Sequence, residues 1–231
     1  MMPSKVALVT GATRGIGLAI AEELCRDYRV LIGGRDPERT ALIAETIPGA
    51  IPFVADLAKE DEIDIAIEEV VAPLGRLDAL INNAGIAAWG HLRDSTREEW
   101  RRVFEINLFG MVDLTTKVLP YVEAVEGTVV NVNSGAGLNV SEGFGVYGAS
   151  KFAVRAFTYA LRIEHGDKIR VTGVHPGRVS TRMQREIEVA GGSRYTRTSE
   201  LNPDTVALSV RAALDMPSGA SIDSVRIRPP P

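Results

Sequence analysis

The chain has 231 residues, a formal net charge of −4 at pH 7 and 24% charged residues. This length is enough for one large α/β domain with a substantial core, and the mildly acidic balance argues against a broad nucleic-acid-binding surface. The sequence has no apolar stretch of about 18 residues and no signal-peptide pattern, so we expect a cytoplasmic protein that does not span a membrane.

Short runs rich in β-branched residues alternate with longer helical patterns along the chain. The runs are almost continuously apolar, which is typical of parallel strands covered by helices on both faces. We therefore predict one α/β domain over residues 1–231, a Rossmann-like doubly wound sheet of about seven parallel strands flanked by helices on both faces. The expected strands are 5–10, 28–33, 51–55, 78–82, 127–133, 169–174 and 223–228, and the expected helices are 15–26, 37–47, 60–73, 97–123, 146–165 and 203–215.

Three local features refine this prediction. Asp36 and Asn202 each precede a proline, a pattern typical of a helix N-cap followed by a first-turn proline. The lone cysteine, Cys25, lies in an apolar-periodic helix and is interpreted as a small core residue. Residues 178–202 show no clear period, so we expect a long loop that acts as a lid.

A glycine-rich segment, TGATRGIG, follows the first strand directly and opens the first helix. Its glycines are Gly11, Gly15 and Gly17, with the spacing G-x-x-x-G-x-G. Glycines at such a turn let a pyrophosphate approach the backbone, and the free N–H groups of the helix N-terminus attract its charge. The segment therefore predicts a dinucleotide site.

The end of the second strand indicates which dinucleotide is bound. A carboxylate there would bind the ribose 2′-hydroxyl of NAD(H), whereas an arginine accepts the 2′-phosphate of NADP(H). The chain has Gly34 followed by Arg35, and Arg14 in the glycine loop is a second candidate for the phosphate. Asp36 remains a possible ribose acceptor, although an N-cap explains it better. We expect NADP(H), with NAD(H) as the alternative.

Tyr147 and Lys151 are four residues apart at the start of a helix, which puts both side chains on one face. A positive charge about 4 Å from a phenol is worth roughly 4 kcal/mol at an effective dielectric of 20, or about three pKa units. This would bring the tyrosine pKa close to neutrality, where a proton donor and acceptor is most effective. Such a pair also occurs by chance on many helices, so its position in the fold must decide whether it is catalytic.

The position of the pair is supported by polar residues near the carboxyl ends of the strands. Ser134 follows the fifth expected strand, and the Asn82–Gly85 segment (NNAG) ends the fourth. Ligands bind at this edge in doubly wound folds. Asn107 lies among apolar residues within a helix, which indicates a buried amide that needs hydrogen-bond partners.

Taken together, these segments resemble the short-chain dehydrogenase/reductase family in its compact single-domain branch. The resemblance covers essentially the whole chain. It rests on TGATRGIG, Asp56-Leu57, NNAG, Asn107, Ser134, YGASK at 147–151 and HPGRVST at 175–181.

The resemblance implies a reaction. Hydride would move between NADP(H) and a small carbonyl or alcohol substrate, with reduction as the expected direction. Tyr147 would be the acid/base, Ser134 would orient the carbonyl, and Asn107 would support a water-mediated proton relay. Lys151 would lower the tyrosine pKa and hold the nicotinamide ribose.

The resemblance also implies a coenzyme site without a metal ion. Asp56 would contact the adenine, Asn83 would shape the pocket, and Val179 and Thr181 would hold the carboxamide. The full set of expected coenzyme-binding residues is Gly11, Thr13, Arg14, Gly15, Ile16, Gly17, Arg35, Asp56, Leu57, Asn83, Ala84, Gly85, Tyr147, Lys151, Pro176, Gly177, Val179 and Thr181.

Further expectations concern the substrate and the assembly. By resemblance, residues 182–202 would cover the substrate, and a homodimer or homotetramer would form on helices 97–123 and 146–165. Asn133 stands where many relatives have a second serine. The chain ends shortly after the last strand, which suggests an open pocket and a broad substrate range. The loop arginines, Arg182, Arg185, Arg194 and Arg197, either invite an acidic substrate or are solvated, and we favour the second.

Two other classes remain as alternatives. A non-catalytic, redox-sensing NAD(P)-binding regulator needs the glycine loop but has no use for Ser134, Tyr147, Lys151 and Asn107 together. An epimerase or dehydratase on the related larger scaffold would need an additional C-terminal substrate domain.

Overall fold

The computed structural model describes residues 5–191 and 200–229. Within them a seven-stranded parallel sheet has the order β3-β2-β1-β4-β5-β6-β7, which confirms the expected doubly wound sheet. The strands are β1 (Lys5–Val9), β2 (Tyr28–Gly34), β3 (Ile51–Val54), β4 (Ala79–Asn82), β5 (Thr128–Val132), β6 (Arg170–Pro176) and β7 (Ser224–Ile227). The α-helices are α1 (Gly15–Leu24), α2 (Pro37–Thr46), α3 (Glu60–Ala66), α4 (Arg97–Phe104), α5 (Gly110–Glu123), α6 (Gly145–His165), α7 (Arg182–Ala190) and α8 (Pro203–Leu214).

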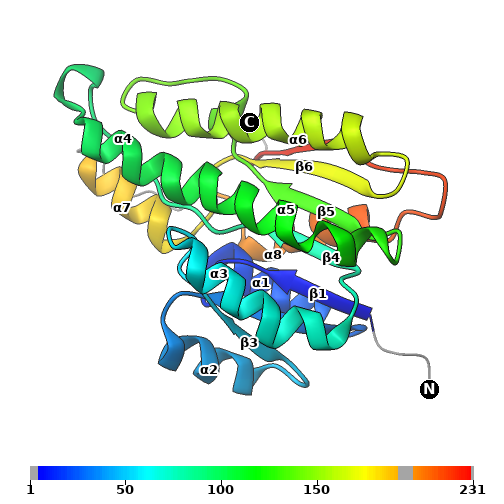
Figure 1. The fold of residues 1–231 in the computed structure, drawn as a ribbon. Helices are drawn as coiled ribbons and strands as arrows, with labels where there is room; N and C mark the ends of the chain where they lie inside the picture. The colour runs from blue at the N-terminus through cyan, green and yellow to red at the C-terminus, as the bar shows by residue number, and fades with distance from the viewer. Residues whose placement is uncertain (1–4, 192–199, 230–231) are drawn as a thin grey trace.

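The core consists of two layers, one on each face of the sheet. Successive strand residues point to opposite faces, so Val6 and Leu8 of β1 belong to one cluster, and Ala7 and Val9 belong to the other. Helices α3, α5 and α6 cover the first face, and α1, α2 and α8 cover the second. Figure 1 shows this arrangement, with α5 in front of the sheet and α1 and α8 behind it.

The strand order reverses between β1 and β4, so the chain leaves these neighbouring strands toward opposite faces. In doubly wound sheets a crevice opens at this point, beyond the carboxyl ends of the strands. The strand arrows of Figure 1 point toward the end of the molecule at which α7 lies. The fold therefore provides a ligand site at that end.

Two expected helices are interrupted. The segment expected as one helix over 97–123 is α4, a π-helical turn η4 (Glu105–Phe109) and α5. A Cβ at Gly110 would collide with the carbonyl of Leu57, so the absence of a side chain lets α5 pack closely against the loop after β3. The segment 60–73 likewise divides into α3, a π-helical turn η1 (Ile67–Val71) and a 3₁₀ turn η2 (Ala72–Leu74).

The expectation of a structureless lid over 178–202 was wrong in part, because α7 occupies 182–190. Thr181 caps this helix by accepting a hydrogen bond from the backbone N–H of Gln184 at 3.2 Å. Arg182 pairs with Glu186 one turn later, with Nε and Oε1 2.7 Å apart. Met183 and Ile187 have the i, i+4 spacing of a helix, but the segment is only nine residues long and four of them are charged, so the pattern is short. The remainder of the expected loop, 192–199, lies outside the described residues.

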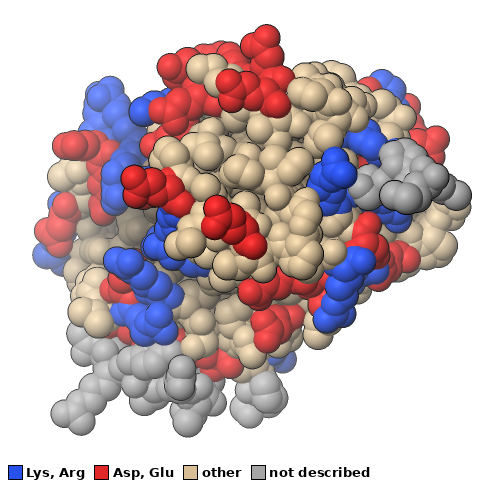
Figure 2. Space-filling model, turned by 90° about the horizontal axis from the view of Figure 1, so that it is seen from below, with Lys and Arg blue, Asp and Glu red and all other residues tan. Residues whose placement is uncertain are grey.

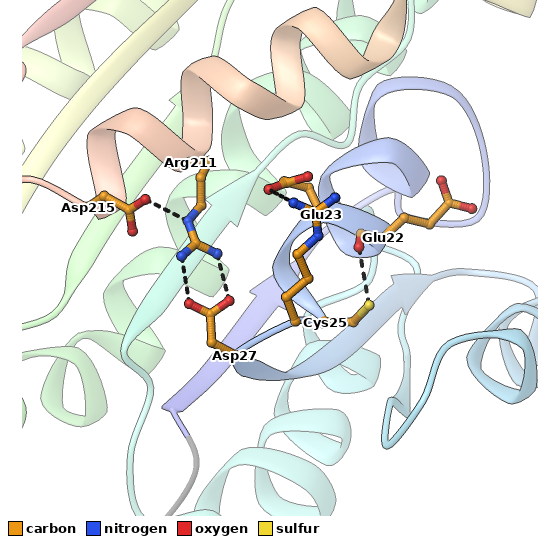
Figure 3. Close-up of polar contacts among 7 residues, drawn as sticks. Glu22, Glu23, Cys25, Asp27, Arg211 and Asp215 are labelled. Carbon is orange, nitrogen blue, oxygen red and sulfur yellow. Dashed lines mark hydrogen bonds and ion pairs between the residues drawn. The ribbon is translucent and has the colours of Figure 1, made fainter.

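The predicted helix caps are confirmed. Asp36 Oδ1 accepts a hydrogen bond from Arg39 N at 3.0 Å, and Asn202 Oδ1 accepts one from Asp204 N at 3.3 Å. Cys25 is only partly buried at the edge of the core, and its thiol donates to the carbonyl of Glu22 at 3.1 Å (Figure 3).

An ion-pair network joins α8 to the turn after α1. The Arg211 guanidinium binds both carboxylate oxygens of Asp27 at 2.6 Å and one oxygen of Asp215 at 2.7 Å (Figure 3). Figure 2 shows side chains of both charge signs on the face seen from below. Of the helices in the described residues, none is long and apolar enough to cross a bilayer.

Candidate active site

A cleft of about 680 Å³ opens at the carboxyl ends of β1, β2 and β4. Its wall brings together residues from the glycine loop, the ends of four strands and the start of α6. The residues expected from the sequence that line the cleft are Gly11, Thr13, Arg14, Gly15, Ile16, Arg35, Asp56, Leu57, Asn83, Ala84, Gly85, Tyr147, Lys151 and Thr181.

Other expected residues do not line the cleft. Gly17 is buried beneath the glycine loop, and the Val179 side chain belongs to the core. Pro176 and Gly177 lie at the end of β6, where Gly177 N donates to Ile227 O at 2.7 Å. Asn107 and Ser134 are not among the residues that line the cleft, but Asn107 binds the backbone of Ile86, which does line it, and the Ser134 hydroxyl acts on the pKa of Tyr147.

The glycine loop needs glycine for its backbone and for its packing. Gly11 and Gly15 have φ values of +62° and +57°, a left-handed conformation that glycine adopts without strain. A Cβ at Gly17 would lie 2.5 Å from Nδ2 of Asn83, so this position has no room for a side chain. Asn83 Nδ2 also donates to Thr10 O at 2.9 Å. The loop after β4 is thereby fixed against the loop after β1.

Thr10, the first residue of TGATRGIG, strengthens this junction, although it was not among the expected site residues. Its hydroxyl accepts hydrogen bonds from the backbone N–H groups of Asn83 at 2.9 Å and Ala84 at 3.0 Å. The same hydroxyl donates to Ile81 O at 3.3 Å. Thr10 therefore holds the Asn83-Ala84 backbone, which lines the cleft.

The end of β2 has no space for an acidic selector. A Cβ at Gly34 would collide with Oγ1 of Thr40 and lie 2.7 Å from the methyl group of Thr13. The carboxylate of Asp36 instead caps α2. No acidic side chain can therefore extend from position 34 without moving these neighbours.

Three arginines line this end of the cleft, one more than the sequence indicated. Arg14 and Arg35 were expected, and Arg39 in the first turn of α2 joins them. The Arg39 guanidinium donates from Nη2 to the carbonyl of Thr13 at 3.4 Å. The helical turn from Asp36 to Arg39 brings the Arg39 side chain back to the cleft. The N-cap pattern at Asp36 was the sequence signal from which the position of Arg39 could have been predicted.

The Tyr147–Lys151 pair is buried at the other end of the cleft. Lys151 is 5% exposed, and its Nζ donates to Val132 O at 3.2 Å. The same Nζ lies 5.9 Å from the centre of the Tyr147 ring. Tyr147 and Lys151 thus lie on one face of α6, as the spacing predicts.

The expectation that the pKa of Tyr147 is lowered toward neutrality was wrong. Burial raises the pKa of Tyr147 above its usual value of 10, while the hydroxyl of Ser134 pulls the pKa downward. Burial also lowers the pKa of Lys151 to about 8. The expectation assumed a charge about 4 Å from the phenol in a polar medium, whereas the pair lies in a desolvated site where both charged forms are disfavoured.

Asn107 is 1% exposed and has the partners that a buried amide needs. Its Oδ1 accepts from Ile86 N at 2.8 Å. Its Nδ2 donates to Ile86 O at 2.9 Å and to Ser150 Oγ at 3.0 Å. Asn107 therefore joins the loop after β4 to the helix that carries Tyr147 and Lys151, and both of its N–H groups are used.

Asn133 also positions the pair, a role that the sequence did not reveal. Its Nδ2 donates to the backbone carbonyl of Lys151 at 3.0 Å, and its Oδ1 accepts from Ser134 N at 2.8 Å. The amide thus bridges the strand end at Ser134 and the helix at Lys151. A serine at this position is too short to make both contacts in the same way.

This site, at the switch point of a doubly wound sheet, defines the chain as a dinucleotide-binding α/β protein with a buried tyrosine–lysine pair. The model of the short chain dehydrogenase family matches residues 5–190. The chain belongs to this family, and it is an oxidoreductase that acts on a small-molecule substrate with a nicotinamide coenzyme.

Three known proteins illustrate the similarity. An NADP-dependent 3-hydroxy acid dehydrogenase of Salmonella typhi is 33% identical, over 97% of this chain and 94% of that protein. The alcohol dehydrogenase of Thermococcus sibiricus, complexed with 5-hydroxy-NADP, is 28% identical with a TM-score of 0.87, over 97% and 96% of the two chains. The 3-ketoacyl-(acyl-carrier-protein) reductase of Brucella melitensis, complexed with NADH, is 27% identical with a TM-score of 0.86, over 99% and 98%.

Proposed function

We propose that this protein is an NADP(H)-dependent reductase of a small ketone or aldehyde, with Tyr147 as the proton donor. The observation that carries the proposal is a single cleft lined by the glycine loop at one end and by Tyr147 and Lys151 at the other. A regulator that only binds the dinucleotide would not need a buried phenol and ammonium beside its coenzyme.

The glycine loop, Asn83 and Thr181 fit a dinucleotide, since they offer close backbone approach and a helix N-terminus within the cleft. When bound, the coenzyme supplies a hydride to the carbonyl carbon. Tyr147 donates its phenolic proton to the carbonyl oxygen, so the product is the alcohol. In the reverse direction the phenolate accepts that proton.

The neighbouring groups tune this proton transfer. The Ser134 hydroxyl lowers the phenol pKa in opposition to burial, and it orients the carbonyl oxygen by hydrogen bonding. Lys151, whose pKa is about 8, is mostly protonated at pH 7, so it stabilises the phenolate and holds the nicotinamide ribose. Asn107 holds the loop after β4 against helix α6. Its side-chain N–H groups are both engaged, so a water relay would use its backbone.

The preference for NADP(H) is supported by the three arginines at the β2 end of the cleft. Arg14, Arg35 and Arg39 can surround a 2′-phosphate, whereas Gly34 offers no carboxylate to a 2′-hydroxyl. The solved relatives include complexes with either an NADP derivative or NADH, so this preference rests on the side chains of this chain.

We further propose that residues 1–231 form one catalytic domain that is cytoplasmic and binds neither nucleic acid nor membrane. A homodimer or homotetramer would form on α4 to α6. Large apolar side chains on these helices and the turn between them support this assembly. They are Phe109, Phe152, Tyr159 and Ile163, the last of which is 84% exposed.

A spectrophotometric screen tests the function directly. The protein is mixed with NADPH or NADH and a panel of ketones, aldehydes and quinones, and the absorbance of the reduced nicotinamide is followed. We expect turnover with NADPH on at least one carbonyl compound. Tight NADPH binding without turnover on any of them would instead favour the regulator.

A further inference from the structure

The start of helix α7 packs against the glycine loop. A Cβ on Gly15 would lie 3.4 Å from the methyl group of Thr181, the N-cap residue of α7. From the first turns of the helix, Arg182, Met183 and Arg185 also line the coenzyme cleft. Helix α7 therefore forms part of the cleft wall beside the glycine loop, at the carboxyl end of the strands (Figure 1).

The N-terminus of α1 is available to an anion at this place. Its N-cap residue, Arg14, makes no side-chain capping hydrogen bond. Four other helices, α2, α4, α7 and α8, are capped by the side chains of Asp36, Thr96, Thr181 and Asn202. Gly15 and Ile16, the first two residues of α1, line the cleft. Uncapped N–H groups at a helix N-terminus bind phosphate, so we expect the coenzyme diphosphate here.

The diphosphate carries two negative charges and lies between the two ends of the bound coenzyme. Arg35 and Arg39 line the cleft at the β2 end, and Lys151 lines it beside Tyr147. Helix α7 adds arginines beside the glycine loop, where the diphosphate charge would otherwise rest on backbone N–H groups and Arg14. A cation from α7 would therefore stabilise the middle of the coenzyme.

The two cleft arginines of α7 differ in their partners. Arg182 Nε pairs with Glu186 Oε1 at 2.7 Å, so the charge of Arg182 is partly balanced within the helix. Arg185 is exposed, and its side chain has no hydrogen-bond or ion-pair partner within residues 5–191 and 200–229. All N–H donors of the Arg185 guanidinium are therefore available to a ligand, and their planar arrangement matches phosphate oxygens.

Arg185 also lies on the correct face of α7. Its backbone N–H donates to Thr181 O at 3.2 Å, so the two residues are one helical turn apart and share a face. Side chains on a helix tilt toward its N-terminus. Arg185 therefore leans back toward Thr181, the residue that packs against Gly15.

We propose that Arg185 binds the coenzyme diphosphate and holds it against the N-terminus of α1. The diphosphate is common to NADPH and NADH, so Arg185 raises the affinity for both coenzymes by the same factor. Arg39 differs in this respect, because the 2′-phosphate at the β2 end is present only in NADPH. The inference goes beyond the proposed function, since it requires neither turnover nor a preference for NADP(H).

Coenzyme titrations test the proposal on the protein without substrate. Arg185→Gln should raise the Kd values of NADPH and NADH by the same factor, about tenfold, because one charge-assisted contact to phosphate is lost. ADP-ribose has the diphosphate but no nicotinamide, and its Kd should rise as much. Adenosine has no phosphate, and its Kd should not change. Calorimetry or competition with NADPH fluorescence gives these values.

Two further variants make the result specific. Arg185→Lys keeps the positive charge but loses the planar fork, so it should recover part of the lost affinity. Arg178→Gln removes an exposed arginine that precedes α7 and is not among the residues lining the cleft. This control should leave all of the Kd values unchanged.

Three outcomes would overturn the proposal. A loss of affinity for NADPH alone would assign Arg185 to the 2′-phosphate. Unchanged coenzyme affinities with a higher KM for an anionic carbonyl compound would assign it to the substrate. Unchanged values throughout would show that Arg185 stays solvated. Failure of the reductase proposal gives a different pattern, since the coenzymes would bind as expected while no carbonyl compound turned over.

Discussion

The Lys151 ammonium lies 5.9 Å from the centre of the Tyr147 ring and donates to the backbone carbonyl of Val132 at 3.2 Å. The two groups are four residues apart on α6 and both are buried. Burial raises the pKa of the phenol and lowers that of the amine to about 8. Burial therefore disfavours the charged form of each group, and this should make the stability of the protein depend on pH.

We predict that Lys151→Met stabilises the coenzyme-free protein at neutral pH. The pKa of Lys151 is about 8 when folded and 10.5 in its ordinary state, so the unfolded chain binds more protons between these values. The cost of Lys151 is complete below pH 8, at about 3 kcal/mol, and disappears as the pH rises to 10.5. Urea unfolding should show a gain at pH 7 that is several times larger than the gain at pH 10. An equal effect at both values would contradict the low pKa.

Tyr147→Phe should remove turnover and retain coenzyme binding. The phenyl ring preserves the packing of Tyr147 but has no proton to donate, and general acid catalysis contributes about 10²- to 10⁴-fold. We expect kcat to fall by this factor while the Kd for NADPH, measured by fluorescence titration, changes little. Retained activity would refute the role of Tyr147.

Arg39→Ala should weaken NADPH binding about tenfold and leave NADH binding nearly unchanged, since a charge-assisted contact to phosphate is worth about 1.5–3 kcal/mol. Arg35→Ala should likewise narrow the preference for NADPH over NADH. The N-cap of α2 is retained in the Arg39 variant, because Asp36 accepts from the backbone of residue 39. The Kd values of 2′,5′-ADP and 5′-AMP give the contribution of the 2′-phosphate without turnover.

Arg97→Ala is a matched control for Arg39→Ala, because Arg97 is an exposed arginine in the first turn of another helix. It should change neither coenzyme affinity. Equal losses for NADPH and NADH in the Arg39 variant would show that this side chain does not recognise the 2′-phosphate.

The sheet and most helices follow from the sequence because their signals are local. Strands such as Ala79–Asn82 are apolar up to their last residue, and the capping pattern at Asp36 is complete within four residues. Helix α7 was missed because its apolar pattern is only two turns long. The breaks at Ile67–Val71 and Glu105–Phe109 depend on tertiary packing, which no local pattern records.

The site residues divide in the same way. Gly11, Tyr147 and Lys151 belong to short motifs, so they could be selected before the fold was known. Arg39 and Asn133 reach the site through contacts with residues 18 or more positions away in the chain. The pKa of Tyr147 could not be predicted either, because spacing fixes the distance to a charge but not the burial that opposes it.

Asn107→Ala should destabilise the protein by about 2–4 kcal/mol, since it leaves the backbone N–H and C=O of Ile86 without their side-chain partner and removes the bond to Ser150 Oγ, which keeps only its bond to Tyr147 O. Asn107→Asp tests the same contacts with a side chain of the same size, because a carboxylate accepts from Ile86 N but cannot donate. The exposed Asn139 offers a control, and Asn139→Ala should change the free energy of unfolding by less than about 0.5 kcal/mol.

Comparing stability with kcat separates two roles for Asn107. If both Asn107 variants lose stability and kcat together, Asn107 acts by holding the loop after β4 against α6. If kcat falls while stability is unchanged, the Asn107 side chain affects turnover by positioning the backbone that a water relay would use, and its buried hydrogen bonds contribute little to the free energy of unfolding.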